Sequence, residues 1–252
     1  MKTIALITGA TAGIGEATAH RLAVAGFNLI ITGRRMERLE ALASTIKEQY
    51  GVEVLPLSFD VSNCAEVEAA IESLPEEFSK IDVLVNNAGL GLGYARFEQC
   101  STADWDTMID TNVKGVLYMS RIVAQKMAPS GEGLIINVGS IAGTQTSPNG
   151  VVYAATKAAL HSMTLGMRVD LLPLGIRVSE VRPGVTRTEF VDVRAHGDLT
   201  FKDKVYGGLE PLEAKDLAEA IGWIATQPTN VNISELEITP QRQASVNHLL
   251  RK

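Results

Sequence analysis

Three side chains between residues 140 and 157 could together move a proton: the hydroxyl of Ser140, the phenol of Tyr153 and the ammonium of Lys157. Tyr153 and Lys157 are four residues apart in a run with a helical pattern, so their side chains should stack on one face of adjacent turns. An ammonium close to a phenol favours the phenolate and lowers the tyrosine pKa. Moving that pKa from about 10 to neutrality takes roughly 4 kcal/mol of differential stabilisation. A solvated helix face is the ordinary alternative for such a pair, so the rest of the chain must decide between the two interpretations.

The elements that position these residues alternate between two patterns along the chain. Short apolar runs rich in β-branched residues predict strands at Thr3–Thr8, Phe27–Thr32, Val52–Leu57, Ile81–Asn86, Gly133–Val138, Ile176–Val181 and Leu236–Ile238. Helical patterns between them lie at Gly13–Ala25, Met36–Gln49, Ala65–Phe78, Ala103–Met127, Tyr153–Leu172 and Glu213–Ala225. No linker or repeat interrupts the alternation, so residues 1–252 are predicted to form a single α/β domain with a doubly wound, Rossmann-type parallel sheet of about seven strands. Ligands of such sheets bind beyond the carboxyl ends of the strands.

Composition excludes several other classes of protein. A length of 252 residues with 46% hydrophobic and 5% aromatic residues fits one domain with a mostly aliphatic core. The net charge of −6 and the lack of a basic stripe argue against a nucleic-acid partner. No run approaches 18 consecutive apolar residues, and Met1 leads into a predicted strand rather than a signal peptide, so we expect a cytoplasmic protein with no membrane partner. The four histidines have no metal-ligand spacing, and Cys64 and Cys100 form no CxxC pair, so we predict no metal site and two free thiols.

The first motif follows the first predicted strand and opens the first predicted helix. It runs from Thr8 to Gly15 and has glycines at positions 9, 13 and 15. Glycines let backbone amides approach a pyrophosphate, and the start of a helix adds partial positive charge. The spacing is G-x-x-x-G-x-G with no G-K-[ST] after it, which excludes a P-loop. The motif therefore predicts a nucleotide site, with a merely tight turn as the alternative.

Two arginines, Arg34 and Arg35, follow the second predicted strand. An enzyme that selects NAD places an acidic residue near this position, whereas arginine accommodates the 2′-phosphate of NADP. Gly33 stands where the acidic residue is expected. Cations at the start of a helix are disfavoured by roughly 0.3–1 kcal/mol each, so a bound anion explains them better than a charged helix start does. We therefore predict NADP(H) as the cofactor.

Further motifs follow in order: Asn-Asn-Ala-Gly at 86–89, then Asn112, Ser140, Tyr153 with Lys157, and Pro-Gly at 183–184. Together with the glycine-rich turn, their order and approximate spacing resemble the short-chain dehydrogenase/reductase family across essentially the whole chain. The resemblance favours an active-site role for Tyr153 and Lys157 over a solvated helix face. It implies an oxidoreductase that transfers a hydride between a nicotinamide cofactor and a small-molecule substrate.

The resemblance also implies a role for each of four catalytic residues. Ser140 would hydrogen-bond the substrate carbonyl oxygen, and Tyr153 would donate its proton as the hydride arrives. Lys157 would lower the tyrosine pKa and hold the hydroxyls of the nicotinamide ribose. Asn112 would anchor a water that relays protons to Lys157.

The same resemblance implies the cofactor contacts. Asp60 and Val61 would bind the adenine, residues 87–89 would line the adenosine ribose, and residues 183–186 would cover the nicotinamide amide, with Thr188 at a phosphate. The full implied set is Gly9, Thr11, Gly13, Ile14, Gly15, Arg34, Arg35, Asp60, Val61, Asn87, Ala88, Gly89, Tyr153, Lys157, Pro183, Gly184, Val185, Thr186 and Thr188.

The substrate is predicted from the segment after Pro183. Residues 187–210 form a long connection with scattered charge, which is typical of a substrate lid. Thr188-Glu189-Phe190, Val193-Arg194 and the late Val231-Asn232-Ile233 and Leu236-Glu237 resemble the bacterial NADP-dependent 3-hydroxy acid dehydrogenase branch. That branch implies serine or 3-hydroxypropionate as alcohols and malonic semialdehyde as a matching aldehyde.

An acidic substrate needs a cation in the pocket. We predict that Arg194 joins Ser140 and Tyr153 in substrate binding, because arginine grips a carboxylate or sulfonate with two bonds. Arg187 and Arg242 are alternatives for this role, and a surface position is the alternative for Arg194 itself.

Other functions stay open. A sulfoacetaldehyde reductase of the same branch would differ mainly in the anion it holds. A reductase of carrier-bound 3-ketoacyl chains would want a basic face, which this chain does not obviously offer. An NADPH-binding sensor or scaffold would have no reason to keep the four catalytic residues together.

The family resemblance also implies a homotetramer. Residues 240–252 form a polar C-terminal tail whose Leu249-Leu250 pair fits docking, and in this branch the tail can approach a neighbouring subunit's pocket. A frayed terminus is the alternative.

Overall fold

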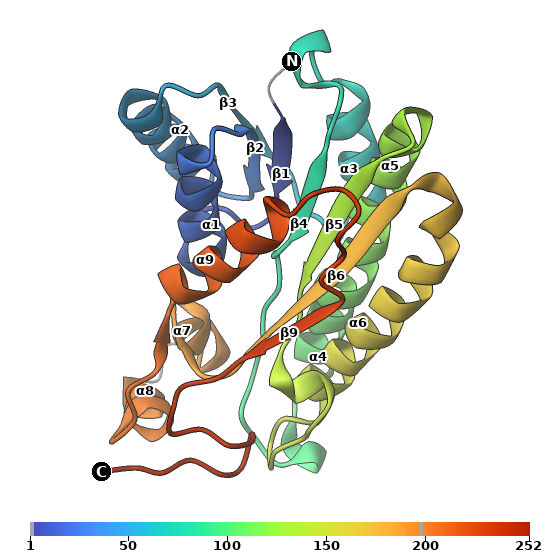
Figure 1. The fold of residues 1–252 in the computed structure, drawn as a ribbon. Coiled ribbons are helices and arrows are strands. Elements are labelled where there is room, and N and C mark those ends of the chain that lie inside the picture. The colour runs from blue at the N-terminus through green and yellow to red at the C-terminus, as the bar shows by residue number, and fades with distance from the viewer. Residues whose placement is uncertain (1–2, 197–198) are drawn as a thin grey trace.

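Seven parallel strands form one sheet through the middle of the molecule (Figure 1). The computed structural model describes residues 3–196 and 199–252. Within that part of the chain the sheet contains β1 (Ile4–Ile7), β2 (Asn28–Gly33), β3 (Val54–Ser58), β4 (Val83–Asn86), β5 (Gly133–Val138), β6 (Ile176–Pro183) and β9 (Glu235–Ile238). Their spatial order is β3-β2-β1-β4-β5-β6-β9, and every neighbouring pair is parallel. The predicted fold class and sheet are thereby confirmed.

Helices cover both faces of this sheet (Figure 1). One face carries α1 (Gly13–Val24), α2 (Met36–Tyr50) and α9 (Ala214–Ala225), and α1 contacts both of the others. The other face carries α3 (Cys64–Glu72), α5 (Gly115–Met127) and α6 (Val151–Asp170), and α4 (Thr102–Ile109) contacts α6. In this arrangement the carboxyl ends of the strands stay accessible to ligands.

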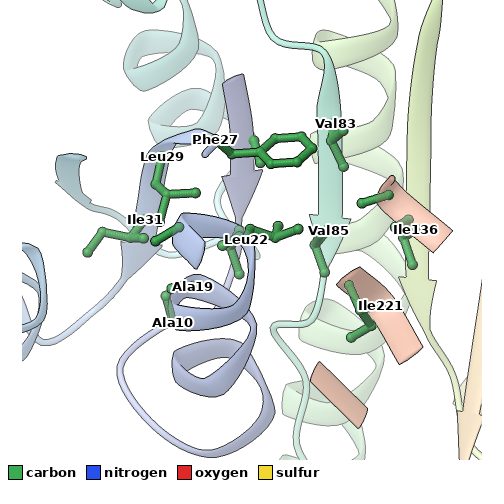
Figure 2. Close-up of a cluster of buried hydrophobic side chains, with 14 of the residues drawn as sticks. Ala10, Ala19, Leu22, Phe27, Leu29, Ile31, Val83, Val85, Ile136 and Ile221 are labelled. Carbon is green, nitrogen blue, oxygen red and sulfur yellow. The ribbon is translucent and has the colours of Figure 1, made fainter. Parts of the chain in front are cut away.

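The strands are buried on both faces, which explains their nearly continuous apolar sequences. Successive side chains alternate between two hydrophobic cores, so Leu6 faces one core and Ile7 the other. Figure 2 shows the core that contains Leu22 of α1 and Ile221 of α9, both fully buried. Replacing Leu22 with alanine would cost roughly 2–5 kcal/mol of stability through lost contacts and the cavity left behind.

Two predicted helices are interrupted. The helix predicted over 65–78 ends as α3 at Glu72, because Pro75 lacks the N–H that an α-helix needs, and a 3₁₀ turn, η1, covers Glu76–Phe78. The helix predicted over 103–127 consists of α4, a π-helical stretch η3 (Asp110–Lys114) and α5. Single π-helical turns occur frequently at functional sites, and this one contains Asn112.

The segment predicted as a lid, residues 187–210, is not a structureless loop. It contains α7 (Phe190–Arg194) and α8 (Leu199–Tyr206). The short strands β7 (Thr186–Arg187) and β8 (Leu212–Glu213) pair in parallel at its two ends. Gly197 and Asp198, which belong to the predicted lid, lie outside the described residues.

The remaining short 3₁₀ turns are η2 (Phe97–Gln99), η4 (Ala128–Ser130), η5 (Ile141–Gly143) and η6 (Leu172–Leu174). The C-terminal tail ends beside α8, at the same end of the molecule as α7 (Figure 1). None of the described helices is both long enough and apolar enough to cross a membrane.

Candidate active site

A cleft of about 520 Å³ opens at the carboxyl ends of the central strands. The strand order reverses between β1 and β4, which is where ligands bind in doubly wound sheets. The predicted site residues that line this cleft are Gly9, Thr11, Gly13, Ile14, Arg34, Arg35, Asp60, Val61, Asn87, Ala88, Gly89, Ser140, Tyr153, Lys157, Pro183, Gly184, Val185, Thr186, Thr188 and Arg194. The other two, Gly15 and Asn112, pack behind its wall against Gly9 and Gly89. The fold therefore brings the separate sequence motifs to one place.

The glycine-rich turn has a shape that side chains would prevent. Gly9 and Gly13 have φ angles of +66° and +59°, in the left-handed region that favours glycine. A Cβ at Gly9 would come within 2.9 Å of the Cα of Ala88, and one at Gly15 would overlap the Gly9 carbonyl. No side chain caps the start of α1 at Ala12, so the first backbone N–H groups of the helix are free for a ligand. This bare backbone at a helix start fits a pyrophosphate.

Hydrogen bonds join the glycine-rich turn to the end of β4. Thr8 Oγ1 accepts from the backbone N–H groups of Asn87, at 3.0 Å, and Ala88, at 2.9 Å. Asn87 Nδ2 donates to the Thr8 carbonyl at 2.9 Å. Sequence reasoning missed the role of Thr8, whose one signal was its place directly after the first strand. These bonds make the two loops beside the cleft a single unit.

Arg35 lies at the start of α2 and is held from two sides. It donates to Thr11 Oγ1 through Nη2, at 2.7 Å, and through Nε, at 3.3 Å. Its Nη1 lies 3.2 Å from the Glu189 carboxylate, and Nη1 of Arg38 lies 2.8 Å from the same carboxylate. The sequence patterns assigned no role at the cofactor end to Arg38 or Glu189, although Arg38 follows Arg35 at helical spacing.

Arg34 approaches Asp60 at the same end of the cleft. Arg34 Nη1 lies 3.7 Å from Asp60 Oδ2, and 68% of the arginine side chain is exposed. Asp60 Oδ1 accepts from the backbone N–H of Ser62 at 2.9 Å and from its hydroxyl at 2.7 Å. Burial acts to raise the pKa of Asp60, but the bonds from Ser62 and the charge of Arg34 outweigh it and hold that pKa below its ordinary value. The carboxylate is therefore an ionised acceptor near neutral pH.

Ser140, Tyr153 and Lys157 meet where β5 ends. Ser140 Oγ accepts from the backbone N–H of Ala142 at 3.1 Å and so caps the 3₁₀ turn η5. Lys157 is buried, and its Nζ donates to the Val138 carbonyl at 2.9 Å. Tyr153 lies one turn before Lys157 on α6, as the spacing predicts, and it lines the cleft together with Ser140 and Lys157.

The pKa of Tyr153 differs from the sequence expectation, in which Lys157 lowers it. Burial raises the pKa of Tyr153, while the hydrogen bond with Ser140 and the charge of Arg194 act in the opposite direction without cancelling the rise. Burial also lowers the pKa of Lys157 to about 8, against the charge of Glu180. A raised pKa keeps the phenol protonated at neutral pH, as a proton donor requires.

Asn112 connects two backbone segments behind the cleft. Its Oδ1 accepts from Leu90 N–H at 2.9 Å, and its Nδ2 donates to the Leu90 carbonyl at 2.7 Å and to Thr156 Oγ1 at 3.0 Å. Thr156 in turn donates to the Tyr153 carbonyl at 2.8 Å. The buried amide therefore ties the loop after β4 to the turn of α6 that carries Tyr153.

Arg194 extends from α7 into the cleft. Its guanidinium carbon lies 5.3 Å from the ring centre of Tyr153 and 5.5 Å from that of Tyr94. Burial lowers the pKa of Arg194, while Tyr153 and Tyr94 act to raise it. Its Nε is buried without a hydrogen-bond partner, and no carboxylate in residues 3–196 or 199–252 forms an ion pair with it. A partly buried guanidinium without a counterion is suited to an incoming anion.

The two alternative arginines do not line the cleft. Arg187 Nε lies 3.0 Å from Glu213, and its guanidinium lies over the ring of Tyr206. Arg242 belongs to the tail and contributes its backbone carbonyl to a bond from Leu250.

Two tail residues, Gln243 and Val246, also line the cleft. Gln243 is buried, and its Oε1 accepts from the backbone N–H of Val185 at 2.8 Å. The backbone N–H of Val246 donates to Gln145 Oε1 at 2.8 Å. The tail therefore lies against the cleft of its own chain, a contact for which its polar sequence carries no signal.

Residues 3–198 match the family model described as short chain dehydrogenase. The chain belongs to this family. Membership accounts for the convergence of the glycine-rich turn, Ser140, Tyr153 and Lys157 on one cleft of this short-chain dehydrogenase.

Several proteins named as reductases or dehydrogenases are similar to this chain over nearly its whole length. A sulfoacetaldehyde reductase from Chromohalobacter salexigens is 44% identical over 245 residues, which cover 97% of this chain and 96% of that protein. An NADP-dependent 3-hydroxy acid dehydrogenase from Salmonella typhi is 46% identical over 242 residues, or 96% of each chain. The closed form of a serine dehydrogenase complexed with NADP+ superposes with a TM-score of 0.92 at 42% identity, covering 99% of this chain and 100% of that one. The family and branch indicated by the motifs are confirmed.

Proposed function

We propose that this short-chain dehydrogenase is an NADPH-dependent oxidoreductase of small acidic aldehydes and the matching 3-hydroxy acids. Family membership and the NADP-dependent relatives support the reaction class and the cofactor. One observation carries the substrate class: Arg194 places a cation beside Tyr153, and that cation has no anionic partner in the described part of the chain.

The cleft fits NADPH from end to end. The free N–H groups at the start of α1 suit the pyrophosphate, and the bare backbone at Gly9 gives it room. Arg34, Arg35 and the neighbouring Arg38 suit the 2′-phosphate, because a guanidinium binds phosphate oxygens with two bonds.

For the adenine, the ribose and the nicotinamide of NADPH, we propose the residues that the family resemblance implies. All of these residues line the cleft: the ionised Asp60 and Val61 would hold the adenine, Asn87, Ala88 and Gly89 would hold the ribose, and residues 183–186 with Thr188 would hold the nicotinamide and a phosphate. When bound, the cofactor supplies or accepts the hydride.

The protein supplies the proton and the orientation. Since Ser140 and Tyr153 both line the cleft, a carbonyl oxygen placed between their hydroxyls would accept from both. Tyr153 then donates its proton, and the ammonium of Lys157, one helical turn away, stabilises the phenolate that results. Lys157 also holds the ribose hydroxyls in this assignment.

Asn112 acts as a positioning residue for these groups. Its side chain is engaged by Leu90 and Thr156, so we assign the proton-relaying water to its backbone in the π-helical stretch. Protons returning to Tyr153 then pass by way of Lys157.

Arg194 orients the acidic end of the substrate. Two parallel N–H groups of a guanidinium match a carboxylate or sulfonate, and the surrounding rings of Tyr153 and Tyr94 strengthen that pairing by excluding water. With the anion fixed on Arg194, the aldehyde carbon at the other end of a short substrate is directed to Tyr153.

The test is NADPH consumption with malonic semialdehyde, succinic semialdehyde, sulfoacetaldehyde and one uncharged aldehyde of similar size. We expect a higher kcat/KM for the short anionic aldehydes than for the uncharged one. Equal values across the panel would contradict the substrate class but not the NADPH chemistry. Absence of all turnover with retained NADPH binding would instead support a sensor or scaffold.

Sulfoacetaldehyde is the second candidate substrate, because a sulfoacetaldehyde reductase is among the relatives at 44% identity. Arg194 accepts either anion, so the ratio of kcat/KM for sulfoacetaldehyde and malonic semialdehyde distinguishes the two.

We also propose a cytoplasmic homotetramer. Support comes from exposed apolar side chains at the end of α6 and beyond, including Val169 at 71% and Leu172 at 73% exposure, which a subunit interface would cover. Light scattering coupled to size-exclusion chromatography tests this, and a mass of one subunit would exclude it.

A further inference from the structure

A fully buried carboxylate, Glu180, lies next to the active site but has no part in the mechanism above. It sits on β6 with an exposure of 0%. Its Oε2 lies 2.6 Å from His161 Nδ1 and 3.6 Å from Arg182 Nη1. Its Oε1 has no hydrogen-bond partner in the described part of the chain. Burying a carboxylate with an unsatisfied oxygen is costly, so its presence calls for a compensating role.

The unpaired oxygen is directed at the backbone that carries the catalytic groups. A Cβ added to Gly139 would overlap Glu180 Oε1, so the carboxylate lies directly against the peptide between Val138 and Ser140. The Val138 carbonyl on this segment is the group that accepts from Lys157 Nζ at 2.9 Å. Glu180 thus touches the backbone that holds the Lys157 ammonium.

The positive charge nearest to Glu180 is not its own alone. Arg182 is shared with two other carboxylates, at 2.5 Å from Glu235 and 3.4 Å from Glu237. Titratable groups on the elements packed around Glu180 are Lys157, His161 and Arg168 on α6, Arg182 on its own strand, and Glu235 and Glu237 on β9. Its neighbour on β5 is the neutral Asn137. Of the three carboxylates only Glu180 is fully buried, whereas the Glu235 and Glu237 side chains are 33% and 40% exposed, so Glu180 is the anion that acts on Lys157 from this side.

We propose that Glu180 is a positioning residue whose buried carboxylate keeps Lys157 in its ammonium form. The effect on catalysis rests on the proposed function, whereas the effect of Glu180 on the charge of Lys157 can be measured without turnover. Its physical basis is that two opposite charges in a low-dielectric interior stabilise each other more strongly than in water.

The sign of the effect is fixed by the lysine titration. Burial lowers the pKa of Lys157 to about 8, and the charge of Glu180 raises it, so the lysine is charged below that pH. Removing the Glu180 charge lowers the pKa further, and the ammonium is then lost at a lower pH. If the reaction needs the ammonium, its rate falls as the pH rises, and without the Glu180 charge that fall begins at a lower pH than in the wild type.

The experiment compares wild-type protein with Glu180→Gln and the control Glu237→Gln. The control removes the same charge from the edge of the same cluster, 3.4 Å from Arg182. The first readout is the pH dependence of Lys157 acetylation by trace acetic anhydride, followed by peptide mass spectrometry, which requires no cofactor. The second is the pH profile of kcat/KM in the reduction direction.

For Glu180→Gln we expect the acetylation midpoint and the alkaline limb of kcat/KM to move down by about one pH unit, and for Glu237→Gln no movement. An acetylation midpoint equal to that of the wild type overturns the proposal. If Glu180→Gln fails to fold, Glu180→Asp, which draws the charge back from Gly139, is expected to give a smaller shift in the same direction, and no shift overturns the proposal. Wild-type protein without any NADPH turnover would refute the proposed function, while the acetylation midpoints would still decide the role of Glu180.

Discussion

The base of the cleft and the segment that we propose as its lid, residues 187–210, are stabilised by different kinds of contact. In the base, Asn86 Nδ2 donates to Ser120 and to Asn137 Oδ1, both at 2.9 Å, and Asn137 Nδ2 donates to Thr164 at 2.9 Å. All four side chains are buried. This chain of hydrogen bonds links β4, β5, α5 and α6, and of the proposed catalytic residues Ser140 follows β5 while Tyr153 and Lys157 extend from α6.

The lid is held mainly at its surface. Lys202 on α8 lies 2.7 Å from Asp192 on α7, and both side chains are at least 40% exposed. Glu189, just before α7, pairs with two arginines of the cofactor end, and it too is about half exposed at 48%. Exposed pairs of this kind contribute about 0–1 kcal/mol each.

Buried hydrogen bonds in the base and exposed ion pairs in the proposed lid suit different tasks. Leaving a buried donor or acceptor unpaired costs about 1–3 kcal/mol, so the base keeps its geometry whether or not a ligand is bound. The proposed lid can open at a small cost per contact, as a segment that admits and releases substrate would require. Changes in the base should therefore affect kcat, while changes in the lid should affect KM.

The largest expected effect is that of Tyr153→Phe in the base. Removing the proposed proton donor should lower kcat by roughly 10² to 10⁴-fold, with a change of less than about twofold in the dissociation constant of NADPH, because the ring stays in place. Stopped-flow turnover and fluorescence titration of NADPH measure the two quantities. Turnover within tenfold of the wild type would remove Tyr153 from the acid/base role.

The second effect concerns the arginines proposed to bind the 2′-phosphate of the cofactor. Glu189 of the proposed lid pairs with one of them, Arg35, and with the neighbouring Arg38. Replacing both Arg34 and Arg35 with alanine should weaken NADPH binding by at least roughly 100-fold, because charge-assisted bonds to the 2′-phosphate contribute about 1.5–3 kcal/mol each. NADH is the internal control, since it presents no phosphate at this position and should lose little affinity. Equal losses for the two cofactors would show that the arginines only shape the start of α2.

Sequence patterns were sufficient for the base because its requirements are local. The glycines of the first turn are needed where φ is positive or where the Cα of Ala88 comes close, and such a requirement is visible in the sequence. Tyr153 and Lys157 are placed by helical spacing alone. The strands were visible because burial on both faces leaves continuous apolar runs.

The lid and the electrostatics could not be predicted in the same way because they depend on distant contacts. Arg194 was selected for its charge and its family position, but its second aromatic neighbour, Tyr94, lies about a hundred residues earlier in the chain. The raised pKa of Tyr153 results from burial, which a pairwise comparison with Lys157 leaves out. The helices α7 and α8 are too short for a clear amphipathic period, so the segment resembled a loop.

The third prediction tests the lid directly. Arg194→Ala should raise KM for anionic aldehydes by roughly 10 to 100-fold, since a charge-assisted pair contributes about 1.5–3 kcal/mol, and should leave an uncharged aldehyde of similar size nearly unaffected. Arg187→Ala is the matched control, because it removes a guanidinium from the same segment that is paired with Glu213 and does not line the cleft. Steady-state kinetics of the three proteins with both aldehydes measure the effect. An unchanged KM for the anions would place the anion site elsewhere.

The smallest expected effect concerns the tail as a support of the lid. Arg251 donates to the Val205 carbonyl at 3.2 Å and to the Gly207 carbonyl, and the backbone N–H of Lys252 donates to the Gly208 carbonyl at 2.9 Å. A cation at the last carbonyls of α8 also complements the helix dipole. Because these contacts are exposed, Arg251→Ala should cost about 1 kcal/mol of lid closure, which corresponds to a rise of roughly fivefold in KM with kcat nearly unchanged.

Arg121→Ala on α5 is the control for Arg251→Ala, since it removes an exposed arginine paired with Glu68, far from the lid. Hydrogen exchange of α8 gives a second readout, and faster exchange there in the Arg251 variant alone is expected if the tail restrains the helix. A lower kcat with unchanged KM would mean that the tail acts on the base instead. The contact through which it would act is Gln243, whose Oε1 accepts from the backbone N–H of Val185. That result would contradict the division of the site into a fixed base and a lid supported by the tail.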